Sequence, residues 1–341
     1  MKKFFVIAAC CLAAFACWGC GSRQPRRIQR VNTAMGTVIQ QNIYTLEADS
    51  PAAEEIEGLL RQLEEKELSR RLDTSEVWAV NQAAGAEEGI LLSPELAKIL
   101  EDCLKLWSRS QGAFDVTIGT VVSLWDIDGW AAGEKEGAFA PPGEEELRRA
   151  LENCGSGRLE LAGDRLFMPE GVQLDLGAVG KGIALNRILR YLEGEEGVTG
   201  AVISLGGSVL TYGEKPDGSS WKVGIANPAD TTSNIGVLSL EGQWCVSTSG
   251  DYERYVEWEG VRYHHILNPA TGCPADSGVS GVTVLSRDGF LSDALSTACF
   301  VLGTEKGMSL AEEYGAEVLF VGKDGSVTMS RGMEEYYRAA E

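Results

Sequence analysis

The chain has 341 residues, of which 44% are hydrophobic, so it can bury a sizeable core in one large domain or two small ones. Thirty lysine and arginine residues stand against fifty aspartate and glutamate residues, which gives a formal net charge of −20. A nucleic-acid binder contacts phosphates through clustered cationic side chains, so this charge argues against nucleic acid as a partner. The charge says little about the fold, which is predicted instead from the order of the elements.

Residues 1–20 have the pattern of a targeting segment rather than of a folded element. Two lysines precede an apolar run, from Phe4 to Phe15, that is too short for a stable membrane-spanning helix. The run ends in small residues and cysteines, which looks like a bacterial lipoprotein signal with the lipid on Cys20 or, as second choice, Cys17. A plain secretory signal is the alternative. We expect a basic tether over residues 21–30 and a lipid anchor that holds the protein on the extracytoplasmic (periplasmic or outer) face of the cell membrane.

The rest of the chain, residues 31–341, mixes amphipathic helices with short strands. Apolar residues at helical spacing predict helices at 52–68, 94–110, 144–153, 291–302 and 305–314. Alternating patterns bounded by glycine predict strands at 158–161, 165–168, 200–210, 221–226, 235–240, 244–248, 253–258, 261–267, 279–286, 317–321 and 325–329. The stretch 126–143 is the most loop-like. Helices mixed with meandering strands indicate an α+β fold, and no second linker interrupts the chain, so we expect one domain.

Five cysteines remain beyond the N-terminal segment. Their scattered spacing implies neither a zinc site nor a disulfide framework. Cys103 and Cys299 fall in apolar helical stretches, so we expect them to be buried thiols.

A glycine-rich turn between a strand and a helix is the feature around which the chain is organised. Residues 172–176 alternate like the end of a half-buried strand, three glycines from Gly177 to Gly182 follow, and a helix continues to Leu192. Free backbone N–H groups at such a helix start favour an anionic ligand, and Lys181 adds a positive charge. The spacing excludes a P-loop and the dinucleotide fingerprint. An ordinary strand-to-helix turn is the alternative.

Asp293 and Thr297 lie four residues apart on one face of the helix predicted at 291–302. Carboxylate and hydroxyl oxygens are ligands that a hard cation such as Mg²⁺ prefers, so the pair is a candidate metal site. The alternative is structural: a carboxylate in the first turn of a helix is stabilised by the helix dipole.

The two histidines of the chain, His264 and His265, are adjacent in a predicted strand. Neighbours in a strand point to opposite faces, so only one of them can face a given pocket. Histidine is the usual proton acceptor near neutral pH, whereas a polar pair at a strand end is the alternative. A hydrolase of the Ser-His-Asp or Cys-His type is disfavoured, because no Gly-x-Ser-x-Gly sequence accompanies the histidines.

Seven motifs in order resemble one known family. They are Met35-Gly-Thr37, Gly112-Ala-Phe-Asp115, the motif from Asp175 to Gly182, Ser204-Leu-Gly-Gly207, Ser247-Thr-Ser-Gly-Asp-Tyr252, His265-Ile-Leu-Asn-Pro269 with Thr271-Gly272, and Asp293-Ala-Leu-Ser-Thr297. Over residues 30 to 330 the chain is similar to the ApbE family, the FAD:protein FMN transferases. The resemblance implies a single ApbE-like domain of mixed, mostly antiparallel sheets with packed helices. Two positions differ from the family's usual pattern: Arg71 stands where an aromatic residue is frequent, and Asn268 replaces a common aspartate.

The resemblance also implies the reaction and the roles of particular residues. FMN would pass from FAD to a threonine or serine hydroxyl of an acceptor protein, such as an Rnf- or Nqr-type redox-pump subunit or another exported flavoprotein, with release of AMP. Mg²⁺, with Mn²⁺ as the alternative, would be held by the Ala178 carbonyl, Asp293 and Thr297. His265 and Lys181 would be catalytic. The positions that match FAD contacts are Met35, Ala113, Phe114, Asp115, Asp175, Lys181 and Ile266.

Two other functions are compatible with the same motifs. An FAD pyrophosphatase would use water in place of the acceptor hydroxyl and release FMN and AMP. A flavin-binding lipoprotein would hold the flavin without chemistry, although the intact pair of Asp293 and Thr297 together with His265 argues against it.

Overall fold

The computed structural model describes residues 24–340 of the chain. The predicted signal peptide and its two candidate lipid-bearing cysteines, Cys17 and Cys20, lie outside the described residues. Within residues 24–340 we find no helix whose length and apolarity would let it cross a bilayer.

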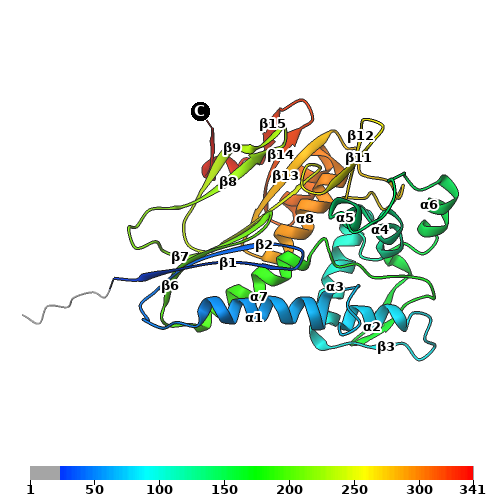
Figure 1. The fold of residues 1–341 in the computed structure, drawn as a ribbon, viewed down its shortest axis with the longest axis horizontal. Coiled ribbons are helices and arrows are strands. Elements are labelled where there is room, and N and C mark those ends of the chain that lie inside the picture. The colour runs from blue at the N-terminus through cyan, green and yellow to red at the C-terminus, as the bar shows by residue number, and fades with distance from the viewer. Residues whose placement is uncertain (1–23, 341) are drawn as a thin grey trace, which may run out of the picture.

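An eight-stranded antiparallel sheet forms the centre of the fold (Figure 1). Its order is β1-β2-β6-β7-β10-β13-β14-β15. The strands are β1 (Arg26–Ala34), β2 (Thr37–Thr45), β6 (Val198–Leu205), β7 (Ser208–Gly213), β10 (Trp244–Gly250), β13 (Val279–Ser286), β14 (Glu317–Gly322) and β15 (Val327–Met329). The tether predicted over residues 21–30 is therefore too long. Arg26 already pairs with Thr45 in the first ladder, and Ile28 packs against the core.

Helices cover one face of this sheet. α7 (Gly180–Gly194) and α8 (Gly289–Leu302) pack against it and against each other, and α1 (Ala52–Gln62) packs on α7. A Cβ atom on Gly182 would lie 2.2 Å from the Gly289 carbonyl oxygen, so only glycine permits α7 and α8 to approach this closely. The largest hydrophobic core lies between these helices and the sheet.

A small antiparallel sheet packs on the opposite face, above the main sheet in Figure 1. Its order is β16 (Tyr337–Ala339), β9 (Asp230–Leu240) and β8 (Trp221–Asn227). Trp221 and Leu238 from this sheet share a second core with Val246 of β10. The protein is thus layered as helices, main sheet and small sheet, which confirms the predicted α+β class with mostly antiparallel sheets.

The remaining elements complete the structure around these layers. They are a π-helical turn (Leu63–Leu68), α2 (Glu76–Gln82), β3 (Ile90–Leu91), α3 (Pro94–Arg109), α4 (Gly119–Trp125), α5 (Ile127–Ala131), α6 (Glu144–Leu151), a 3-10 turn (Ser156–Arg158), β4 (Glu160–Ala162), β5 (Arg165–Phe167), β11 (Tyr255–Trp258), β12 (Val261–His264), α9 (Thr304–Glu313) and α10 (Met333–Tyr336). The helices α2, α4, α5 and α6 gather at one end of the main sheet, on the right of Figure 1.

Most predicted elements are present, and two predictions are corrected. The stretch 126–143 is not only loop, because α5 forms within it. Residues 172–176 alternate as expected but do not form a strand. The segment has only an isolated bridge, from Gln173 to Ile118, and its neighbours are the Asn81 side chain and the Val116 carbonyl rather than a second strand. Cys103 and Cys299 are buried, as predicted.

Candidate functional site

Two adjoining cavities lie where the helical face, the main sheet and the α4–α5 corner meet. The inner cavity has a volume of about 140 Å³ and the outer one about 810 Å³. The volume of the outer cavity is within the usual range for small-molecule sites. The two cavities share a wall formed by Arg71, Val122, Asp128, Asp175, Gly177, Lys181, Thr248, Glu253 and Arg254. Of the predicted site residues, Met35 lines only the outer cavity, and Asp175 and Lys181 line both cavities. The inner cavity is lined by Ala113, Phe114, Asp115, Asp175, Ala178, Lys181, His265, Ile266, Asp293 and Thr297.

Asp293 is a buried carboxylate that faces the cavity rather than capping its helix. α8 begins at Gly289, and the side chain of Asp288 caps it by accepting the Leu291 amide. The Asp293 side chain instead accepts the Gly182 amide at Oδ2 over 2.8 Å and the Ser208 hydroxyl at Oδ1 over 3.3 Å. The alternative of a first-turn carboxylate therefore describes Asp288, which leaves Asp293 available for another role.

Three hard oxygen donors converge on the inner cavity. Asp293 and Thr297 lie one turn apart on α8, and Ala178 lies within the turn before α7. Because the Gly182 amide donates to Asp293, it does not take up the carbonyl four residues earlier, that of Ala178. Thr297 Oγ1 has a long contact of 3.3 Å to Ser249 Oγ. A carbonyl, a hydroxyl and a carboxylate fit Mg²⁺ or Mn²⁺, which complete their shell with water or phosphate oxygens.

This donor set is poor in charged ligands. Within residues 24–340, no group of three or more histidine, cysteine, aspartate or glutamate side chains is arranged to hold a metal ion. The preference for a hard cation therefore rests on the carbonyl, hydroxyl and carboxylate oxygens themselves, since zinc and other softer metals prefer nitrogen and sulfur ligands.

Lys181 lies in the wall between the two cavities, on the first turn of α7. Its ammonium group is 3.8 Å from Asp293 Oδ1, and its side chain remains 21% exposed. The N-terminus of a 15-residue helix adds a partial positive charge next to it. This end of the site is therefore suited to a phosphate group.

The two histidines point in different directions, as expected, although β12 ends at His264 rather than at residue 267 as predicted. His265 lines the inner cavity, and its Nδ1 lies 3.2 Å from the Arg254 carbonyl oxygen. His264 is buried on the other side, where its Nε2 contacts the Ala275 carbonyl oxygen and its ring packs edge-on against Phe300. Burial, and then the charges of Arg254 and Lys181, lower the pKa of His265 well below its ordinary value. His265 is thus neutral at neutral pH.

Two of the predicted flavin contacts, Phe114 and Asp115, are engaged within the protein. Phe114 is buried in the main core. Asp115 accepts hydrogen bonds from the amide and hydroxyl of Thr117 at 2.8 and 2.6 Å, and from the amide and hydroxyl of Ser156 at 3.0 and 2.6 Å. Asp115 consequently fixes the loop that forms this wall, and its carboxylate has little capacity left for a ligand.

Met35 projects from the turn that joins β1 and β2. Its φ of 53° is in the left-handed region, which side chains other than glycine rarely adopt. Its amide donates to Glu64 Oε2 over 2.8 Å, which ties the turn between β1 and β2 to the π-helical turn that follows α1. Such strain is frequent in binding sites, and here it directs Met35 into the outer cavity. Ile266, by contrast, is buried against the inner cavity.

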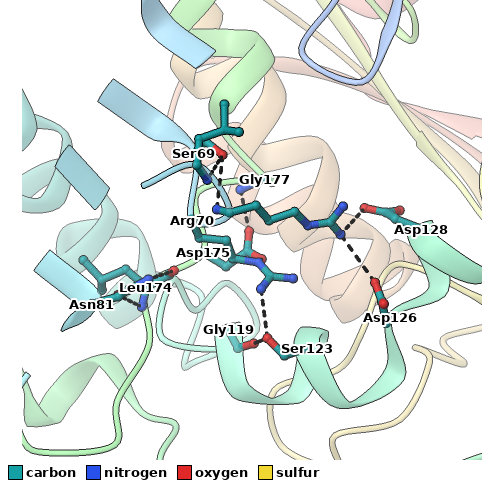
Figure 2. A network of polar contacts seen from close by, with 12 residues as sticks. Ser69, Arg70, Asn81, Gly119, Ser123, Asp126, Asp128, Leu174, Asp175 and Gly177 are labelled. Carbon is teal, nitrogen blue, oxygen red and sulfur yellow. Dashed lines mark hydrogen bonds and ion pairs between the residues drawn. The ribbon is translucent and has the colours of Figure 1, made fainter. Parts of the chain in front are cut away.

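Asp175 is paired with an arginine that the sequence pattern did not indicate (Figure 2). Arg70 Nε lies 2.6 Å from Asp175 Oδ2, and Arg70 also donates to the hydroxyl of Ser123 on α4. The next residue, Arg71, pairs with Asp126 and Asp128, 3.6 Å from each carboxylate. Arg71 lies in the wall that the two cavities share.

Sequence reasoning also missed Glu253 and Arg254, which lie between the two cavities. Arg254 pairs with Asp128 over 2.9 Å. Glu253 lines both cavities, and its side chain is exposed to solvent. Both residues directly follow the motif that ends at Tyr252, so their position next to a motif was the available signal.

The fold is of the α+β class, and its two adjoining cavities are lined by a lysine at a helix N-terminus and by carboxylate and hydroxyl side chains. Among solved structures, the ApbE protein of Thermotoga maritima superimposes with a TM-score of 0.81 at 29% identity, covering 92% of this chain and 100% of that one. The flavin transferase ApbE from Vibrio cholerae gives 0.80 at 28% identity, covering 92% and 99%. A protein of Treponema pallidum (strain Nichols), named FAD:protein FMN transferase, is 34% identical over 343 residues, 94% of this chain and 92% of that protein. The sequence model of the ApbE family matches residues 35–320. The chain belongs to the ApbE family.

Proposed function

We propose that this protein is an FAD:protein FMN transferase that attaches FMN, through a phosphoester, to a threonine or serine hydroxyl of an acceptor protein. The observation that carries the proposal is the convergence of Ala178, Asp293 and Thr297 with Lys181 and His265 on one cavity. The names of its relatives support the same activity.

The reaction balances without any redox partner. The acceptor oxygen forms a bond to the FMN phosphorus, the bond from that phosphorus to the bridging oxygen breaks, and AMP leaves with the electron pair. The pyrophosphate of FAD carries two negative charges that would repel an attacking oxygen. Lys181 and the amide groups at the start of α7 lie where they can offset that charge.

Ala178, Asp293 and Thr297 would hold Mg²⁺, with Mn²⁺ as the alternative. When bound, the cation would supply Lewis-acid neutralisation of the phosphate oxygens. The protein's part is to present one carboxylate and two neutral oxygens, so that the remaining positions can be filled by phosphate and water.

His265 would accept the proton of the acceptor hydroxyl. A carbonyl oxygen can only accept, so the Nδ1 contact with the Arg254 carbonyl requires the proton of the neutral ring to be on Nδ1. Nε2 is then the basic nitrogen. The lowered pKa keeps this ring unprotonated at neutral pH, as a general base must be.

The proposed acceptor and location rest on the sequence alone. With a lipid anchor in the N-terminal segment, the domain would stay at the extracytoplasmic membrane surface, where Rnf- or Nqr-type subunits or other exported flavoproteins would present a threonine or serine.

The test is to incubate the purified protein with FAD and Mg²⁺, with and without a candidate acceptor, and to follow FMN, AMP and acceptor mass. A transferase adds the mass of FMN to the acceptor and releases one AMP for each addition. Free FMN should not replace FAD, because it lacks the AMP leaving group. Rapid release of FMN and AMP with no labelled acceptor would instead favour the pyrophosphatase, and unaltered FAD would favour a non-catalytic flavin-binding protein.

A further inference from the structure

We propose that Arg70 and Asp175 are positioning residues: their ion pair fixes the turn that carries Ala178 and Lys181, and so sets how strongly this end of the site holds a divalent cation. The inference rests on the proposed function for the use of a cation. The motif predicted Asp175 as a contact to FAD, whereas its two carboxylate oxygens are directed to groups of the protein (Figure 2).

The pair connects three separate segments. Arg70 follows the π-helical turn, and its Nε contacts Asp175 Oδ2 over 2.6 Å. Its terminal nitrogen donates to Ser123 over 2.8 Å, and Ser123 in turn donates to the Gly119 carbonyl over 2.8 Å. Both charged side chains are largely buried, at 15% and 14% exposed. A buried arginine with partners on two elements holds those elements in a defined relation.

The other oxygen of Asp175 controls the turn itself. Oδ1 accepts the Gly177 amide over 2.8 Å, and a Cβ atom at Gly177 would come within 2.9 Å of that oxygen. The backbone before the turn is held independently, since the Asp175 amide donates to the Val116 carbonyl and both backbone groups of Leu174 bond to Asn81. The Asp175 side chain therefore links a fixed segment to the turn on which Ala178 lies.

Arg70 also removes an electrostatic obstacle. Asp175 lines both cavities, and an unpaired carboxylate there would repel the pyrophosphate of FAD. Pairing with Arg70 neutralises that charge while it aims the carboxylate at the turn. The two effects, charge and geometry, can be separated by choice of substitution.

A matched control exists in the pair of Arg187 and Glu67. It joins α7 to the π-helical turn over 2.9 Å, with exposures of 14% and 17%, close to those of Arg70 and Asp175. Neither residue lines the inner or the outer cavity. Arg187→Gln should therefore destabilise the protein to a similar degree as Arg70→Gln without affecting the cation.

The first measurement is amide hydrogen exchange of the full chain without substrate. Arg70→Gln and Asp175→Ala should speed exchange at Gly177 by at least about tenfold, since the amide loses an oriented acceptor. Asp175→Asn should have a smaller effect, because its amide oxygen can still accept from Gly177. Arg187→Gln should leave exchange at Gly177 unchanged. Equal exchange at Gly177 in wild type and in Arg70→Gln would overturn the proposal.

The second measurement is the Mg²⁺ concentration that half-saturates FAD binding, followed by flavin fluorescence. Arg70→Gln should raise it about 10- to 100-fold, the range for losing a residue that orients a metal ligand, and Arg70→Lys should restore part of the loss. A rise of equal size in Arg187→Gln would make the effect one of general stability and refute a positioning role. If FAD binding by wild type did not respond to Mg²⁺ at all, the metal part of the proposed function would fail, while exchange at Gly177 would still decide whether the pair fixes the turn.

Discussion

Replacing Asp293 separates its structural contribution from its contribution to the metal site. Asp293→Asn keeps an oxygen for the Gly182 amide, so it should cost only about 1–2 kcal/mol, the difference between a charged and a neutral hydrogen bond. Asp293→Ala leaves that amide buried without its acceptor, and the cost should rise to roughly 2–4 kcal/mol. At roughly 2 °C per kcal/mol in a chain of this size, thermal unfolding should resolve the two variants.

The effect on ligand binding should change sign with the metal. Asp293 lines a cavity that must hold an anion, and it lies 3.8 Å from Lys181. With EDTA present, Asp293→Asn removes a negative charge and should bind FAD as well as wild type or better. With Mg²⁺ present, the variant should bind FAD more weakly and need at least about tenfold more Mg²⁺. Losing a metal ligand should weaken metal binding at least as much as losing a residue that orients a ligand. Fluorescence titrations of FAD measure both conditions. If the Mg²⁺ titrations of wild type and Asp293→Asn superimpose, Asp293 is not a metal ligand.

Three further predictions concern the histidines and the helix crossing. His265→Ala should suppress FMN transfer to the acceptor while FAD still binds, and His264→Ala should do much less; wild-type-like transfer by His265→Ala would exclude it as the base. Because the pKa of His265 is lowered, FMN transfer should stay constant as the pH falls to 6.5 and decrease only at lower pH. The unfolded chain takes up a proton on His265 near pH 6.5 that the folded protein does not, so the contribution of this residue to the free energy of unfolding is complete above that pH and is lost below it. Thermal unfolding of wild type and His265→Ala at pH 7.5 and 5.5 can check this difference. Gly182→Ala places a Cβ 2.2 Å from the Gly289 carbonyl oxygen and should lower the free energy of chemical unfolding by at least about 1–3 kcal/mol. Gly194→Ala, on the same helix with open space around it, should be neutral or stabilising. Equal stabilities of the two variants would contradict the close approach of α7 and α8.

The parts of the site that sequence predicted best are those governed by local periodicity. Asp293 and Thr297 are one helical turn apart, and a helical pattern places them on the same face. His264 is the last residue of β12, and the side chain of His265, the next residue, turns to the other side, as the predicted strand alternation required. The helix pattern therefore placed its pair through the element itself, whereas the strand pattern placed the histidines correctly although the strand ends one residue too early to contain both.

The parts that sequence could not predict depend on contacts between distant segments. Asp115 and Asp175 both lie in motifs, and both looked available for a ligand. Asp115 is instead engaged by Ser156, and Asp175 by Arg70. No periodicity relates these partners, because the loops that carry them meet only when the fold is complete. The five-residue helix α5 was missed for a related reason, since a single turn is too short to show a helical period.

The charge of the site explains why these carboxylates have to be engaged. Among the residues that the structure describes, four cationic side chains and seven carboxylates line the two cavities. The cations are Arg70, Arg71, Lys181 and Arg254, and the carboxylates are Glu64, Asp115, Asp126, Asp128, Asp175, Glu253 and Asp293. Such a site would repel the pyrophosphate of FAD if every acid were free. Protein donors or arginines hold Asp115, Asp126, Asp128 and Asp175, and the Met35 amide donates to Glu64. Asp293 accepts the Gly182 amide and the Ser208 hydroxyl and lies 3.8 Å from Lys181, so a divalent cation held by Asp293 would offset the remaining negative charge and favour the binding of an anion such as FAD.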